Sequence, residues 1–100
     1  MERADAVKYF WKTFIDKIPN GVLEYISETE LEISKLKDVM GNPLYPIDTG
    51  DLKSFLFFVD IEPNANWTHK CAYAIISDAK ENAWYEHFWP PEESIKLIEV

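Results

Sequence analysis

The sequence predicts an α+β domain in which an N-terminal helix packs on a four- to five-stranded, mainly antiparallel sheet. Two observations lead to this fold class. Apolar residues near the N-terminus recur at helical spacing, and nine aromatic residues between 54 and 91 lie in or beside three strand-like segments. Short connections between those segments make neighbouring strands antiparallel. The sequence also allows a second short helix near residues 34–40.

Residues 4–18 form the clearest predicted element. Pro19–Asn20–Gly21 should end this helix, because a residue before proline avoids helical geometry and glycine accepts the left-handed conformation. We expect Trp11 and Phe14 to be buried against the sheet. The apolar side chains recur three or one positions apart and therefore share one face of the helix: Val7, Phe10, Trp11, Phe14, Ile15 and Ile18.

A strand over residues 21–27 is predicted next, and the four residues from Ser27 to Glu30 can be read in two ways. They form either a hairpin turn before a strand at 31–33, or a capping box that opens a helix at Glu28. We favour the turn.

The short helix over 34–40 would then follow, with a buried side formed by Leu36, Val39 and Met40 and an end at Gly41. A loop is predicted over 42–53, which contains two prolines and a turn-forming Asp-Thr-Gly-Asp sequence. Three further strands are predicted, with residues 94–100 as a candidate edge strand: 54–61, 70–77 and 84–89.

Both faces of the two central predicted strands are apolar, unlike those of a sheet with one wet side. Such a sheet needs two covers, and one helix about 10 Å wide leaves part of even a small sheet bare. The second face should be covered either by the short helix and the 42–53 loop or by another chain. Phe55, Phe57, Val59 and Ile61 should point one way and Leu56 and Phe58 the other; Cys71, Tyr73 and Ile75 should likewise oppose Ala72, Ala74 and Ile76.

The charge of the chain narrows the classes of partner. One hundred residues make a single domain, 1–100, with 10 basic and 18 acidic side chains and a net charge of −8. The acidic excess is spread along the chain. A negative field repels phosphate backbones and anionic lipid, so neither nucleic acid nor membrane is an expected partner, whereas a basic protein is.

Cys71 is the one cysteine and cannot form an internal disulfide, which favours a reducing compartment. No apolar segment approaches the length of a membrane span, and no secretory signal is recognisable. We therefore expect a cytoplasmic protein.

The candidate reactive group is Cys71 with His69 or His87, because a cysteine within hydrogen-bond reach of a histidine can act as a nucleophile. A small thiol-dependent enzyme is therefore an alternative function. A thiol inside an apolar strand is usually inert, however, so we expect no catalytic residue. Nothing resembles the spacing of a zinc site, and no metal or cofactor is expected.

An aromatic and acidic surface in the second half is the preferred candidate site, because exposed aromatic residues are frequent interface anchors. Trp67 could instead plug the open end of the core. The predicted function is a protein-binding module, either an inhibitor or immunity-type protein or an assembly subunit, including self-association through the sheet. A small-ligand binder at the aromatic end of the sheet is a further alternative. The predicted binding residues are Asn66, Trp67, Trp84, Tyr85, Glu86, Trp89, Glu92 and Glu93.

Overall fold

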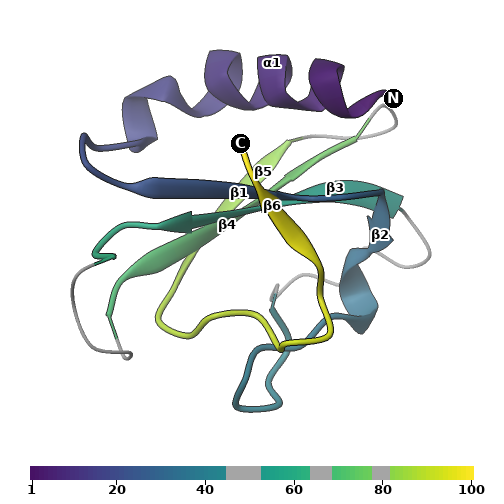
Figure 1. Cartoon of the computed structure of the whole chain (residues 1–100), viewed down its shortest axis with the longest axis vertical. Helices are drawn as coiled ribbons and strands as arrows, with labels where there is room; N and C mark the ends of the chain where they lie inside the picture. Colours follow the sequence, from purple (N-terminus) through teal and green to yellow (C-terminus); the bar gives the residue numbers. More distant parts are fainter. Residues whose placement is uncertain (45–52, 64–68, 78–81) are drawn as a thin grey trace.

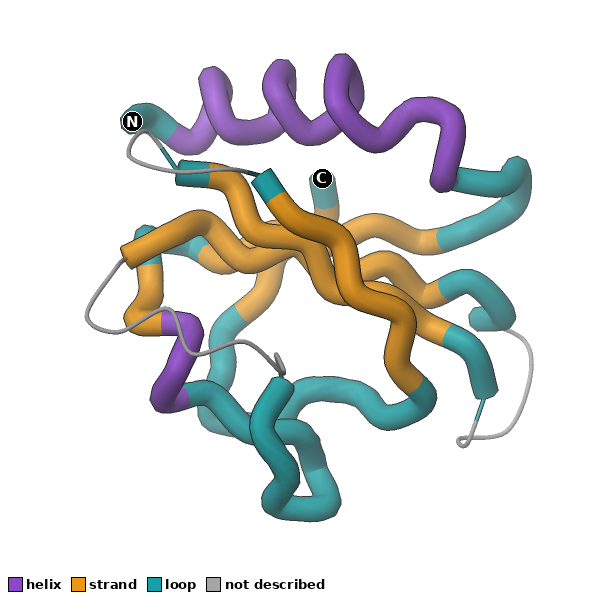
Figure 2. Tube along the Cα trace, turned by 180° about the vertical axis from the view of Figure 1, so that it is seen from behind, coloured by secondary structure: helices purple, strands orange, loops and turns teal. Residues whose placement is uncertain are grey.

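Helix α1 (Arg3–Phe14) lies on one face of a six-stranded sheet, and irregular segments of the chain lie on the other (Figures 1 and 2). A computed structural model describes residues 1–44, 53–63, 69–77 and 82–100. The strands are β1 (Leu23–Ser27), β2 (Leu31–Glu32), β3 (Lys53–Asp60), β4 (Cys71–Ile76), β5 (Ala83–His87) and β6 (Leu97–Glu99).

The main sheet has the order β5-β4-β3-β1-β6, and β2 pairs with the start of β3. Every pairing between these strands is antiparallel. The predicted α+β fold is therefore confirmed, with β6 at the edge beside β1. The short strand β2 raises the number of strands to six.

The turn after Ser27 is confirmed, because residues 28–30 form a bend between β1 and β2 and no helix opens at Glu28. The predicted helix over 34–40 is wrong. A single 3-10 turn, η2 (Ile33–Lys35), takes its place, and the chain then forms a tight hairpin in which Lys37 pairs with Pro43. The predicted loop over 42–53 lies mostly outside the described residues.

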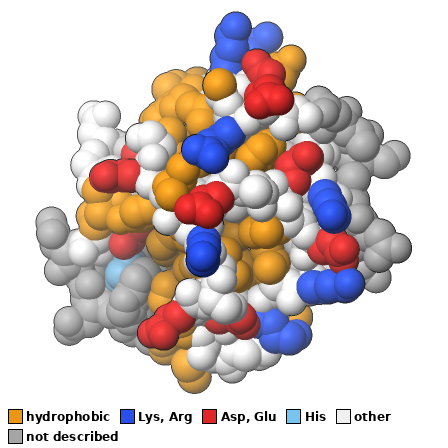
Figure 3. Space-filling model, turned by 45° about the vertical axis from the view of Figure 1, so that its right-hand side comes forward, with side chains coloured by type: hydrophobic (Ala, Val, Ile, Leu, Met, Phe, Trp, Pro, Cys, Tyr) orange, Lys and Arg blue, Asp and Glu red, His pale blue; other side chains and the backbone are white. Residues whose placement is uncertain are grey.

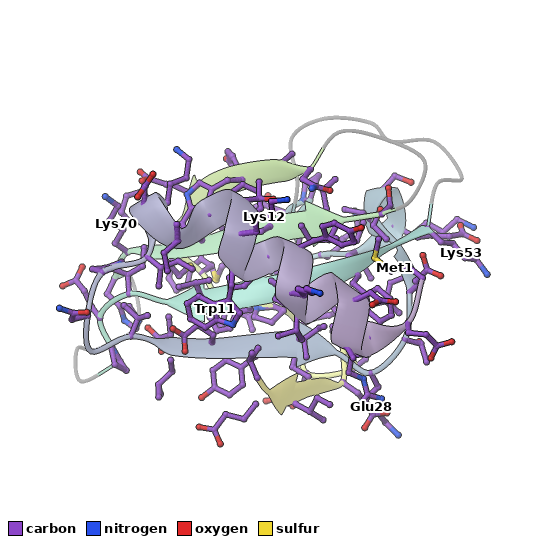
Figure 4. The ribbon with its side chains drawn as sticks, turned by 90° about the horizontal axis from the view of Figure 1, so that it is seen from above. Met1, Trp11, Lys12, Glu28, Lys53 and Lys70 are labelled. Atoms are coloured by element: carbon purple, nitrogen blue, oxygen red, sulfur yellow. The ribbon has the colours of Figure 1, made fainter. Side chains whose placement is uncertain are left out.

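Two details of the N-terminal helix differ from the prediction. The α-helix ends at Phe14 and continues as a 3-10 turn, η1 (Ile15–Lys17). Because a 3-10 turn is wound more tightly, Ile15 leaves the buried face and is 56% exposed. Phe14 is buried as expected, whereas Trp11 is only half-buried beside the core (Figure 4). Gly21, with φ of 80°, follows in the left-handed conformation.

The upper core joins α1 to the sheet. Phe10 is fully buried and stacks on Phe57 of β3, with ring centroids 4.1 Å apart and planes 2° from parallel. Small side chains on β4 leave room for these rings. The buried members are Ala6, Phe10, Phe14, Ile26, Phe55, Phe57, Val59, Ala72, Ala74 and Ile76.

The lower core lies on the opposite face of the same strands, so the predicted division of β3 and β4 side chains between two faces is confirmed. Its buried members are Ile33, Leu44, Leu56, Phe58, Cys71, Tyr73 and Ile75. Leu36, Ile95 and Leu97 pack against it from outside the central strands. The chain therefore covers its own second face with irregular segments, and no second chain is required to bury β3 and β4.

Two segments form this lower cover, residues 33–44 and 88–97. Backbone hydrogen bonds join them: the Val39 N–H donates to the Pro90 carbonyl at 3.0 Å, and the Glu92 N–H donates to the Lys37 carbonyl at 3.0 Å. The hairpin and the segment after β5 therefore form one continuous layer below the sheet.

Replacing Phe10 with alanine should lower the free energy of unfolding by about 3–5 kcal/mol, because it removes a fully buried ring and leaves a cavity. Chemical denaturation measures the loss. Exposed Ile15→Ala is the control and should change stability by no more than about 0.5 kcal/mol. Equal effects of the two substitutions would contradict the packing of α1 on β3.

Candidate functional site

Reactive and titratable side chains gather at one end of the lower core. The strand register places Asp60, Cys71 and His87 side by side across β3, β4 and β5. His69 lies just before β4, and Asp38 reaches the cluster from the 37–43 hairpin. The fold therefore brings together the cysteine and both histidines that the sequence singles out.

Each histidine is paired with a carboxylate. His87 Nε2 lies 2.8 Å from Asp38 Oδ2, and His69 Nε2 lies 2.7 Å from Asp60 Oδ1. Both carboxyl groups are nearly or fully buried. Pairing of this kind offsets the cost of removing a carboxylate from water.

Asp38 also organises the hairpin that carries it. Its Oδ1 accepts hydrogen bonds from the backbone N–H groups of Met40, at 2.8 Å, and Asn42, at 3.1 Å. Burial acts to raise the Asp38 pKa, but the hydrogen bonds from His87 and from these N–H groups outweigh it and hold the pKa below its usual value. The same bonds explain the absent helix, since an aspartate that satisfies nearby N–H groups favours a turn.

Cys71 is held as a neutral thiol. Its Sγ donates to the Trp89 carbonyl at 3.6 Å, and the Tyr73 hydroxyl donates to the same oxygen at 2.7 Å. Burial raises the Cys71 pKa to about 12, with a further contribution from the negative charges of Asp60 and Asp38. Burial raises the Tyr73 pKa as well. Because the thiolate is the nucleophilic form, this environment does not activate Cys71.

No metal centre is formed by the described residues, in which no three His, Cys, Asp or Glu side chains are grouped to hold an ion. The cluster instead joins the sheet to its lower cover. Asp38 fixes the hairpin through His87 of β5, and Tyr73 of β4 fixes the segment after β5 through the Trp89 carbonyl.

The predicted binding residues lie in different environments. Trp84 packs on the upper core beside Phe14, with ring centroids 5.4 Å apart, and Tyr85 packs on the lower core. Trp89 is half-buried, and Asn66 and Trp67 lie outside the described residues. The fold therefore uses Trp84 and Tyr85 partly as packing residues.

The three predicted acidic residues lie at the surface or close to it. Glu86 is exposed, with Oε1 3.5 Å from Lys70 Nζ, and Glu93 is also exposed. Glu92 is half-buried and accepts a hydrogen bond from the Ser94 hydroxyl.

Three large apolar side chains in the lower cover are exposed, and the sequence pattern assigned two of them, Val39 and Met40, to the buried side of a helix. Val39 is 46% and Met40 58% exposed at the tip of the hairpin, and Phe88, just after β5, is 57% exposed. The Val39–Pro90 backbone hydrogen bond brings their segments together. We refer to these three exposed residues, which lie on two hydrogen-bonded segments, as the Val39–Met40–Phe88 patch. The Gly41-Asn42-Pro43 sequence was the signal for a hairpin tip at this position.

Comparisons of the chain with protein-family models, with curated proteins and with solved structures found no match. Within the described residues, no helix has both the length and the apolar character needed to cross a membrane.

Cys71 should react slowly with an aromatic disulfide reagent in the native protein and rapidly after denaturation, because the buried thiol stays protonated. Absorbance of the released thiolate follows both reactions. Fast native labelling, at a rate that rises with pH well below 9, would contradict the environment described for Cys71.

Asp38→Asn should destabilise the protein at pH 7 but progressively less as the pH is lowered below about 4. The folded-state pKa of Asp38 is depressed, so its contribution is present above the unfolded-state pKa and lost as the pH falls through the folded-state value. Urea denaturation between pH 3 and 7 measures the difference from wild type. Exposed Asp16→Asn is the control. A difference that stays constant down to pH 3 would refute the assignment.

Proposed function

We propose that this protein is a protein-binding module that uses the Val39–Met40–Phe88 patch as its apolar anchor for a basic partner protein. The observation that carries the proposal is the exposure of three large apolar side chains on two segments held together by backbone hydrogen bonds. Phenylalanine and methionine are enriched in protein interfaces, and a few buried anchors supply most of the binding energy.

The frame behind the patch supports this role. The Asp38 carboxylate accepts the Met40 N–H and pairs with His87, which directly precedes Phe88. The backbone on both sides of the patch is thereby held before a partner arrives. A pre-organised surface loses less conformational entropy on binding, which favours affinity.

Charge favours a basic partner over a second copy of this chain. Each copy carries a net charge of −8, so two copies repel one another, whereas a basic surface is attracted. Glu86 and Glu93 are exposed on the same part of the chain as Phe88. Acids at the rim of an interface act mainly on the association rate. An inhibitor, an immunity-type protein and an assembly subunit would all use such a surface.

Phe88→Ala and Met40→Ala should each weaken the complex by about 2 kcal/mol without lowering the free energy of unfolding by a similar amount. The partner is first identified by mass spectrometry after capture on immobilised protein, and its affinity is then measured with purified components. Tyr9→Ala is the matched control, because Tyr9 is 46% exposed on α1, on the opposite side of the sheet.

Equal loss of affinity in Tyr9→Ala and Phe88→Ala would refute the assignment of the interface to the patch. Sedimentation of the purified protein alone tests whether a second copy of the chain binds the patch instead. A dimer that Phe88→Ala dissociates would replace the basic partner with a second copy of the chain.

A further inference from the structure

An open pocket of about 300 Å³ lies on the lower side of the sheet, outside the patch. It is lined by Tyr25, Phe58, Asp60, Pro91, Ile95 and Leu97. Its walls come from two sources: β1 and β3 of the sheet, and residues 91–97, which run below the sheet from the β5 side to β6 (Figure 1). Its volume is at the lower end of the range for small-molecule sites.

One wall of the pocket is aromatic. Tyr25 and Phe58 are directly paired across β1 and β3, and their rings stack with centroids 6.0 Å apart. Aliphatic side chains of Ile95 and Leu97 provide apolar surface elsewhere in the lining. Both kinds of surface can contact an unbranched alkyl stem.

The one charged side chain among the described lining residues of the pocket is acidic. Asp60 contributes a carboxylate whose side chain is 11% exposed; Oδ1 contacts His69, and the second oxygen can accept a further hydrogen bond. Glu99 pairs with Tyr25 across β6 and β1. Burial raises the Tyr25 pKa, and repulsion by Glu99 and Asp60 raises it further, so both carboxylates act on this phenol. No basic side chain is among the described lining residues.

We propose that this pocket binds an aliphatic ammonium group, carried either by a free alkylamine or by a lysine side chain of another protein. The ammonium donates to Asp60 in a charge-assisted hydrogen bond and lies near the faces of Tyr25 and Phe58, where a cation–π attraction adds to it. The alkyl stem contacts Ile95 and Leu97.

A neighbouring pocket does not meet the same conditions. It has about 320 Å³ and is bounded by Glu28 and Glu92 but also by Lys35 and Lys96. Acidic and basic side chains are likewise interspersed on the face shown in Figure 3. Opposite charges in one lining select no single sign of ligand, whereas the Asp60 pocket has only acidic charge among its described lining residues.

The first test titrates the protein with n-butylammonium chloride at constant ionic strength and follows the ring resonances of Tyr25 and Phe58 by NMR. Saturable shifts of these rings are expected. n-Butanol, the neutral probe of similar shape, should bind more weakly by about tenfold or more, because it lacks the charged hydrogen bond to Asp60. Equal affinity for the two probes, or shifts that do not saturate, would overturn the proposal.

Asp60→Asn should weaken n-butylammonium binding by about tenfold or more, with Glu86→Gln as the control that removes an exposed acid outside the pocket. Ile95→Phe gives a second variant that keeps Asp60 and narrows the pocket, so binding should fall there too. Unchanged affinity in a folded Asp60→Asn or Ile95→Phe protein would overturn the proposal.

Two further arms separate the sources of the ammonium and the two sites on the protein. N-acetyl-lysine-N-methylamide should bind more tightly than n-butylammonium if the natural ligand is a lysine side chain, and less tightly if it is a free amine; either order is compatible with an ammonium pocket.

Phe88→Ala should leave n-butylammonium binding unchanged, because Phe88 does not line the pocket. Failure of the pocket and failure of the patch are therefore distinguishable.

Discussion

The rest of the structure depends on burying both faces of β3 and β4. All six residues of β4 and residues 54–60 of β3 are buried, so the two strands form the middle of three layers. Apolar area on both sides supplies the main driving force for folding, provided that each side has a cover. The helix covers the upper face, while irregular chain covers the lower one.

The two covers satisfy their backbone groups in different ways. A helix bonds its own N–H and C=O groups, so α1 can cover the sheet through its side chains alone. Irregular chain near a core must find other partners for its polar groups. Here the Asp38 carboxylate accepts hydrogen bonds from the Met40 and Asn42 N–H groups. The Trp89 carbonyl accepts one from the Tyr73 hydroxyl.

This requirement explains the chemistry at the end of the lower core. The histidine–carboxylate pairs and the thiol resemble a reactive constellation in composition, but two of their bonds, His87–Asp38 and Cys71–Trp89, hold the lower cover in place. The third, His69–Asp60, joins the residue before β4 to the end of β3. Asp38 also connects the buried cluster with the proposed interface, because the hairpin that it organises carries Val39 and Met40. The proposed ammonium pocket has a related origin, because residues 91–97 cross below the sheet and leave an opening beside Tyr25, Phe58 and Asp60.

The sequence by itself determined the elements whose signals are local. Helical spacing of apolar residues identified α1. Successive side chains of a strand point to opposite faces, and this rule divided the side chains of β3 and β4 correctly between the two faces. Both patterns depend only on backbone geometry. Only the tertiary structure decided how the second face is covered and which apolar residues stay exposed. Val39 and Met40 have helical spacing from Leu36, yet they lie on a hairpin because Asp38 pairs with His87, 49 residues away. Contacts with distant elements likewise decide the places of two aromatic residues near β5. Trp84 packs beside Phe14 of α1, whereas Phe88 is exposed. These outcomes depend on contacts between distant parts of the chain, and such contacts leave no periodic signal in the sequence.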